Sequence, residues 1–253
     1  MKLLLVAVML GGCTVGAGDD GGGGGGGGAG GYPGSLMGII AHMRQTIYDA
    51  QAYAGEPKDA FLAALQPAAQ GREFSLFVAD TSREIHRALT LSKELGLKPI
   101  IVGGREAYQL SESLAASKVP VIVRADLGTE PALTGDDTTP AEIRKERRDD
   151  WAERTSNLAN LIKAGVPVAL TSDGARTDFL KNARKLLNFG VSPADVLRAL
   201  TSGGAEVLGV GSKRGTIKVG MDGDFVLMSG NFEDEKSVVK AVVSGGTMTE
   251  VSK

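Results

Sequence analysis

The sequence predicts an α/β fold in which a parallel sheet is covered by helices and followed by a small C-terminal β appendage. Two observations lead to this prediction. Between residues 74 and 190, short apolar runs alternate four times with stretches of helical periodicity, the pattern of strand–helix units with parallel strands. After Gly215 the apolar period changes to two, which is typical of short antiparallel strands joined by turns.

The first residues predict an export signal. Lys2 is followed by an apolar run from Leu3 to Leu10 and then by small residues, a layout too short to span a bilayer as a helix. Residues 10–13, LGGC, resemble a bacterial lipobox, in which Cys13 is lipidated. Plain signal cleavage with an incidental cysteine is the alternative. We therefore expect 1–13 to be a signal peptide with a lipobox, and the protein to be periplasmic or an outer-membrane lipoprotein.

Residues 14–31 are so rich in glycine that they cannot bury apolar surface, so we expect a flexible tether. A phosphate-binding loop is excluded because no strand precedes these glycines and no Lys-Ser/Thr pair follows them. The single cysteine excludes an intramolecular disulfide. The net charge of −2 provides no basic field for nucleic acid.

The elements are expected in the order of two helices, four strand–helix units, a helical pair and antiparallel strands. The helices are expected over 38–54, 57–71, 82–96, 106–118, 141–165, 178–190 and 192–210. The strands of the four units are expected over 74–80, 98–104, 119–126 and 166–174, and further strands within 215–231 and 237–251. Gly96 is expected to close a helix, and Ser192 to cap one that begins at Pro193.

The carboxyl ends of the four expected strands are the candidate site, because loops converge there while the sheet stays rigid. The strands end at Asp80, Gly103-Gly104, Asp126 and Ser172-Asp173. An aspartate at a strand end is also a common helix N-cap, and for Asp80 and Asp126 both roles stay open. The Gly103-Gly104 pair leaves room for either a ligand or a tight turn.

Four segments resemble the second half of amidohydrolase-superfamily proteins, in particular the exported, imidazolonepropionase-like group. They are "YPGSLMGIIAHMRQTIYDAQAY", "PIIVGGREAYQLSESLAASKVPVIV", "AGVPVALTSDG" and "LRALTSGGAEVLGVGSKRGTIKVGMDGDFVLMSGNF". They occur in the order of that family, and the likeness covers about residues 32–250. The resemblance implies a partial (β/α)8 TIM-type barrel of about four βα units over 32–212, with β-sandwich strands over 213–253.

The resemblance also implies metal-assisted hydrolysis of carbon–nitrogen (non-peptide) bonds in amides or cyclic amides. In that scheme the aspartate that ends the last barrel strand binds the metal and accepts a proton from the attacking water. Asp173 holds this position, and Asp80 is a second candidate metal ligand. The implied cofactor is one divalent metal such as zinc, with no cofactor as the alternative.

The sequence departs from the family at the metal site. Family members use a His-x-His pair from the first strand and histidines from two middle strands, whereas this chain has only His42 and His86, both within helical patterns. Zinc prefers three or four N, S or O protein ligands. A degenerate centre is therefore one expectation, and a non-catalytic exported half-barrel that binds a small molecule or a partner chain is the alternative.

The partners follow from the expected half-barrel. We expect the chain to lack the first barrel strand of the family, and unpaired sheet edges favour association. A homodimer, a complementing N-terminal half and a truncated gene product are the options. We also expect a small-molecule substrate of unknown identity and no nucleic-acid partner. Membrane attachment is expected only through the lipid anchor.

Overall fold

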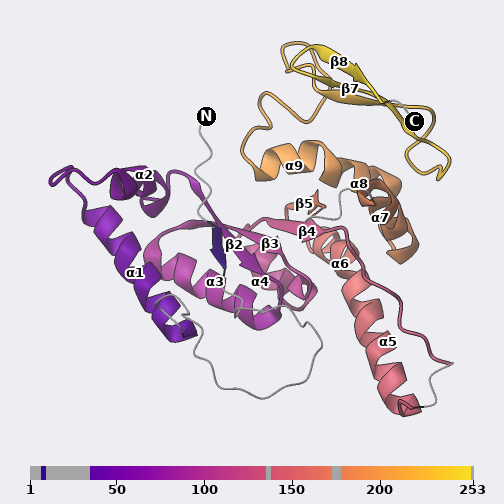
Figure 1. Cartoon of the computed structure of the whole chain (residues 1–253), viewed down its shortest axis with the longest axis horizontal. Helices are drawn as coiled ribbons and strands as arrows, with labels where there is room; N and C mark the ends of the chain where they lie inside the picture. The colour runs from indigo at the N-terminus through magenta and orange to yellow at the C-terminus, as the bar shows by residue number, and fades with distance from the viewer. Residues whose placement is uncertain (1–6, 10–34, 135–137, 173–177, 252–253) are drawn as a thin grey trace, which may run out of the picture. The chain divides into compact units, whose positions relative to one another are not determined.

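A computed structural model describes residues 7–9, 35–134, 138–172 and 178–251. The chain divides into two compact units, Met1–Ile101 and Val102–Lys253. Figure 1 shows both with their helices and strands labelled. The predictions for Asp173, Cys13 and the glycine tether lie outside the described residues. The described helices include none that is long and apolar enough to cross a membrane.

Besides the short strand β1, the first unit contains β2 and most of β3, which alternate with helices; β3 continues into the second unit. The elements are α1 Leu36–Ala52, α2 Ala60–Ala69, β2 Phe74–Ala79, α3 Ser82–Leu95 and β3 Lys98–Gly103. Helices α1, α2 and α3 share a core because their apolar faces meet; it consists of Ile47, Ala50, Leu65, Ala69 and Leu95. At its edge Arg44 and Glu94 form a two-pronged ion pair, with N–O distances of 2.6 and 2.7 Å.

A short strand, β1 Ala7–Met9, pairs in parallel with β2, with Ala7 opposite Leu76 and Met9 opposite Val78. Parallel pairing satisfies backbone groups along β2. The strand lies within the segment for which the sequence predicts an export signal, and that assignment stays a prediction.

Helix α3 begins and ends as its sequence predicts, with one correction at its start. Thr81, not Asp80, is the N-cap: the Thr81 hydroxyl accepts from Glu84 N, while Glu84 Oε2 accepts from the N–H groups of Asp80 and Thr81 at 2.9 and 3.0 Å. This reciprocal capping box satisfies the free N–H groups of the first turn. Gly96 ends the helix in the left-handed conformation, with φ of 67°.

The second unit continues the alternation of strands and helices. After β3 come the 3-10 helix η1 Ala107–Leu110 and α4 Ser111–Ala116, then β4 Val121–Arg124 with α5 Ala141–Thr155 and α6 Asn157–Lys163. Strand β5 Val168–Thr171 is followed by α7 Phe179–Lys185, η2 Leu186–Phe189, α8 Pro193–Leu200 and α9 Ser202–Val207. Ser192 caps α8 by accepting from Asp195 N, as predicted.

Strands β4 and β5 pair in parallel, in a register that runs from Val121 opposite Val168 to Arg124 opposite Thr171. Helices α8 and α9 pack on β5. The close approach needs Gly203, because a Cβ there would lie 2.9 Å from Val168 O. Strand β4 therefore pairs with a strand, β5, that is itself covered by α8 and α9.

The chain ends in a separate antiparallel sheet of β6 Phe225–Met228, β7 Val239–Ser244 and β8 Thr247–Glu250. Arg184 of α7 fastens the β6–β7 connection, since it donates to Phe232 O and Ser237 O at 2.7 Å and to Glu235 O at 3.4 Å. Residues 216–221, which alternate like a strand, form turns and irregular backbone instead.

The prediction of the fold class is confirmed. Four strands, β2 to β5, alternate with helices, β1–β2 and β4–β5 pair in parallel, and an antiparallel three-stranded sheet follows. This is the arrangement of part of a TIM-type barrel with a small β appendage. The domain boundaries expected from the sequence stay predictions.

Candidate functional site

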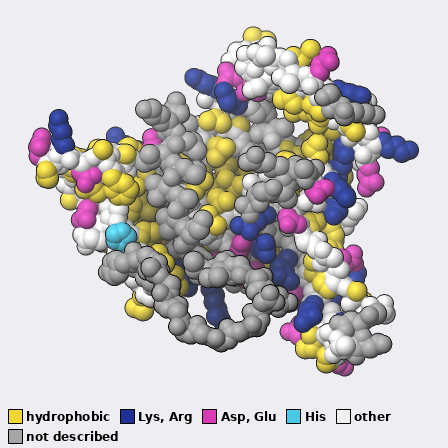
Figure 2. Space-filling view, viewed as in Figure 1, with side chains coloured by type: hydrophobic (Ala, Val, Ile, Leu, Met, Phe, Trp, Pro, Cys, Tyr) yellow, Lys and Arg dark blue, Asp and Glu magenta, His cyan; other side chains and the backbone are white. Residues whose placement is uncertain are grey.

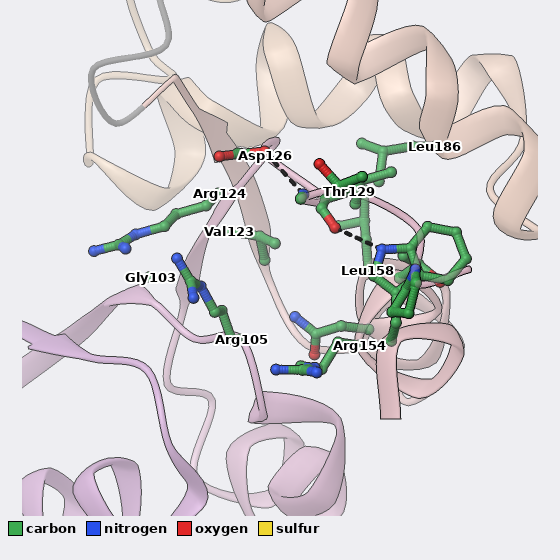
Figure 3. Close-up of a pocket in the computed structure, with 15 residues that line it drawn as sticks. Gly103, Arg105, Val123, Arg124, Asp126, Thr129, Arg154, Leu158 and Leu186 are labelled. Atoms are coloured by element: carbon green, nitrogen blue, oxygen red, sulfur yellow. Dashed lines mark hydrogen bonds between the residues drawn. The ribbon is translucent and has the colours of Figure 1, made fainter. Parts of the chain in front are cut away.

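A cavity of about 250 Å³ lies where β3 and β4 end, entirely within the second unit; we call it the rim pocket (Figure 3). Strand β3 contributes its last residue, Gly103, and β4 contributes Val123 and Arg124. The other walls come from the loops after these strands and from helices α5 and α6. They comprise Arg105, Asp126, Leu127, Gly128, Thr129, Pro131, Trp151, Arg154, Thr155, Asn157, Leu158 and Leu186.

Asn157, at the start of α6, fixes the loop that follows β3. The side chain is only 3% exposed. Its Nδ2 donates to Gly104 O at 2.8 Å, and its Oδ1 accepts from Tyr108 N at 2.8 Å. Because buried backbone groups need partners, the amide fits this position by offering a donor and an acceptor together. The loop that bears Arg105 is thereby tied to the helix on the other side of the pocket.

Tyr108 makes a second tie between the same loop and α5. Its hydroxyl donates to Glu153 Oε2 at 2.9 Å. Burial raises the pKa of the Tyr108 phenol above its usual value, and the neighbouring Glu153 carboxylate adds to the rise. The phenol therefore stays protonated and remains a hydrogen-bond donor at neutral pH.

One face of helix α5 holds the loop that follows β4. Trp151 Nε1 donates to Leu127 O at 2.9 Å, and its ring meets Phe189 edge-to-face at 5.4 Å. Arg148 pairs with Glu130 and donates to Pro131 O at 3.2 Å. Positions 148 and 151 share a helix face because they are three residues apart. The loop after β4 is therefore attached to α5 at two positions along the helix.

The charge of the rim pocket is mostly positive. Arg105, Arg124 and Arg154 line it, against the single carboxylate of Asp126. Oδ1 of Asp126 accepts from Gly128 N at 2.9 Å, so this aspartate closes a local turn. Asp126 does not cap a helix, since α5 begins fifteen residues later, after Pro140. Guanidinium groups around an apolar floor suit an anionic, partly apolar molecule.

Of the two expected metal ligands, Asp80 lies in the described part of the chain and Asp173 lies outside it, so the predicted metal pair stays a prediction. Asp80 is half-buried, directly follows β2 and belongs to the first unit. His42 and His86 are exposed on α1 and α3, and Figure 2 shows histidine at the surface. Within residues 7–9, 35–134, 138–172 and 178–251, no three His, Cys, Asp or Glu side chains form a possible metal site. These residues therefore do not fit zinc, which needs three or more protein ligands.

Sequence reasoning missed the arginines. Arg124 is the last residue of β4 and stands two residues before Asp126, and its position at the strand end is a usable signal. Arg154 belongs to a run of mixed charges that is typical of a solvated helix face. Its place in the pocket depends on the break between α5 and α6 near Ser156, which local periodicity does not reveal.

Comparisons with known proteins identify a family model and several proteins to which this chain is similar. A model of the amidohydrolase family matches residues 77–249. The imidazolonepropionase of Aliivibrio salmonicida is 37% identical over 73 residues, which are 26% of this chain and 18% of that protein. An amidohydrolase of Thermotoga maritima, known from a crystal structure, matches with a TM-score of 0.70 and 26% identity, over 85% of this chain and 56% of that one.

A putative prolidase from Bifidobacterium longum shares the fold with a TM-score of 0.57 at 18% identity, over 83% of this chain and 59% of that one. At this identity the likeness concerns the fold alone. The chain thus spans little more than half the length of these two solved structures, and 18% of the imidazolonepropionase.

Proposed function

The chain belongs to the amidohydrolase family, and from this premise we propose that it serves the hydrolysis of carbon–nitrogen bonds in amides or cyclic amides. The observation that supports this most is the position of the rim pocket. It lies at the ends of β3 and β4, inside the segment that the family model matches. Active sites of (β/α)8 barrels are built at this end of the strands.

In this proposal the described residues bind and orient the substrate. Trp151, Leu158 and Leu186 offer an apolar surface, and Arg105 and Arg154 offer positive charge. Asn157 and Tyr108 hold the loops that carry these groups. Holding a substrate in one orientation lowers the barrier because the entropy of alignment is lost on binding instead of in the reaction.

Asp173 is proposed to accept the proton of the attacking water, as the family resemblance implies. It lies outside the described residues, directly beyond Ser172, at the end of the segment that contains β5. The described residues do not supply a zinc site. Any histidine ligands would therefore come from a complementing N-terminal half.

The test measures hydrolysis by the purified full chain, with and without added zinc, on a panel of simple amides and cyclic amides. Asp173→Asn is expected to abolish turnover, whereas Asp178→Asn, an exposed neighbour, is expected to leave it unchanged. Elemental analysis of the same samples reports the metal content. Turnover that survives in Asp173→Asn would refute the proposed role of this carboxylate.

A second candidate is an exported half-barrel that binds a small molecule without catalysis. The lack of a three-residue metal cluster in the described part of the chain favours it. It predicts that the chain binds ligands in the rim pocket but hydrolyses none of the panel, whatever the zinc concentration. Light scattering after size exclusion would show whether the chain forms a homodimer, which both candidates allow.

Export and lipid attachment remain part of the proposal. The apolar run at 3–10 and Cys13 support them. Mass spectrometry of the protein expressed in a bacterium is expected to find a lipid on Cys13 as the first residue. A mature N-terminus at another position, without lipid, would contradict the lipobox assignment.

A further inference from the structure

The rim pocket combines an excess of positive charge with an apolar floor, and this combination restricts its ligand. Three arginines face one aspartate among the lining residues, and the aspartate is already engaged by Gly128 N. An anion entering this cavity meets cations with little competition from Asp126. A neutral ligand would gain nothing from the charges of Arg105 and Arg154, whereas an anion can pair with them.

Arg105 and Arg154 approach the cavity from two different elements (Figure 3). Arg105 follows β3 on the loop that Asn157 ties down, so its backbone is fixed although its side chain is exposed. Arg154 comes from α5, and its Nε donates to Asp150 O at 3.0 Å. That bond anchors the side chain and leaves its two terminal nitrogens to a ligand. Arg124 has contacts of its own, so the inference rests on the other two arginines.

The rest of the cavity suits the apolar body of a compact molecule. Trp151, Leu158 and Leu186 lie on one side, and Leu158 and Leu186 are almost fully buried at 1% exposure. The indole is held by its hydrogen bond to Leu127 O, so this wall is preorganised. A cavity of about 250 Å³ is below the range of roughly 300–1,000 Å³ that drug-sized ligands occupy. The ligand should therefore be small.

A carboxylate fits the cavity better than a phosphate. Guanidinium groups bind either anion through paired N–H donors. Phosphate sites, however, commonly add several backbone N–H groups, and here Gly128 N is already bonded to Asp126. A doubly charged group would also face the Asp126 carboxylate, whereas a single negative charge meets less repulsion.

We propose that the rim pocket is a subsite for a small organic acid with an apolar body, whose carboxylate binds between Arg105 and Arg154. This inference rests on the proposed function, because it names the class of substrate that the same site would take. The scissile amide would then lie toward the strand ends, and the acid group would fix the orientation.

The test is a binding titration by calorimetry with the full chain and a matched pair of probes, N-acetyl-leucine and the neutral N-acetyl-leucinamide. The acid is expected to bind at least tenfold more tightly than the amide at low salt. Arg105→Gln and Arg154→Gln should each weaken acid binding by about tenfold, which corresponds to about 1.4 kcal/mol. Binding of the neutral amide should hardly change.

Arg147→Gln is the matched control, because Arg147 is an exposed arginine of the same helix α5 that does not line the cavity. It is expected to bind the acid as the wild type does. Equal affinities for acid and amide, or an equal loss in Arg147→Gln, would overturn the proposal. Inorganic phosphate that competes more strongly than the acid would overturn the assignment of a carboxylate.

The binding data separate this inference from the proposed function. A chain that binds the acid through both arginines but hydrolyses no amide refutes the hydrolase and leaves the subsite intact. A chain that hydrolyses amides without a preference for acids, and without loss in the arginine variants, refutes the subsite alone.

Discussion

Replacing Asn157 by alanine should destabilise the second unit strongly, although the side chain is small. The substitution removes the donor to Gly104 O and the acceptor of Tyr108 N, both at 2.8 Å. Gly104 O would keep only the bond from Ala107 N at 3.1 Å, whereas Tyr108 N, which belongs to a half-buried residue, would lose its acceptor. A buried polar group left unsatisfied costs about 1–3 kcal/mol, so we expect a loss of about 1–3 kcal/mol for Asn157→Ala.

Urea unfolding followed by circular dichroism measures this loss. The midpoint for Asn157→Ala is expected to fall below that of wild type, and Asn157→Asp should fall at least as far, because a buried carboxylate oxygen would then face Gly104 O. Asn160→Ala, an exposed position on the same helix α6, is the control and should change stability by less than about 0.5 kcal/mol. An Asn157→Ala midpoint equal to that of Asn160→Ala would refute the role of the side chain.

Two further predictions concern the C-terminal region. Arg184→Ala should lower the free energy of unfolding by about 1.5–3 kcal/mol, because three carbonyls of the β6–β7 connection lose their donor; chemical denaturation checks this, and the exposed Lys181→Ala should be neutral. Gly215→Ala should cost about 2 kcal/mol or more, because a Cβ there would lie 2.6 Å from Ala205 Cβ and φ is 95°. Gly220→Ala is the control and should cost less, because φ is 87° there but a Cβ would meet open space. Thermal melts compare the two variants, and equal melting points would contradict the packing argument.

Much of the fold could be predicted from local sequence patterns. The four strand–helix units follow from the apolar periodicity, and the helix ends at Gly96 and Ser192 follow from the residue types. These features depend on residues close together in the chain. Of the segment 215–231, in which strands were expected, only β6 Phe225–Met228 is a strand; residues 216–221 form turns and irregular backbone, with Ile217 and Val219 87% and 107% exposed. Strand β6 forms because it pairs with β7, and alternation along the chain does not show which part of a segment finds such a partner.

The candidate site was only partly predictable. The sequence pointed to the strand ends, and the rim pocket lies at the ends of β3 and β4; a functional role for the predicted aspartates stays a prediction. The positive charge was missed, because Arg154 and Arg105 are brought to one cavity by tertiary contacts. Among these is the bond between Asn157 and Gly104, which are 53 residues apart. Patterns along the chain carry no information about such pairs.

The central claim is that the rim pocket is the functional site, and amide-resolved NMR of the full chain tests it most directly. On titration with N-acetyl-leucine, shifts are expected at the amides of Gly103, Arg105, Gly128 and Leu158, which line the pocket. A second cavity lies at the opposite, amino-terminal end of β5, lined by Val166, Val168, Arg198 and Gly203. Shifts confined to those residues, with none at the rim pocket, would contradict the claim.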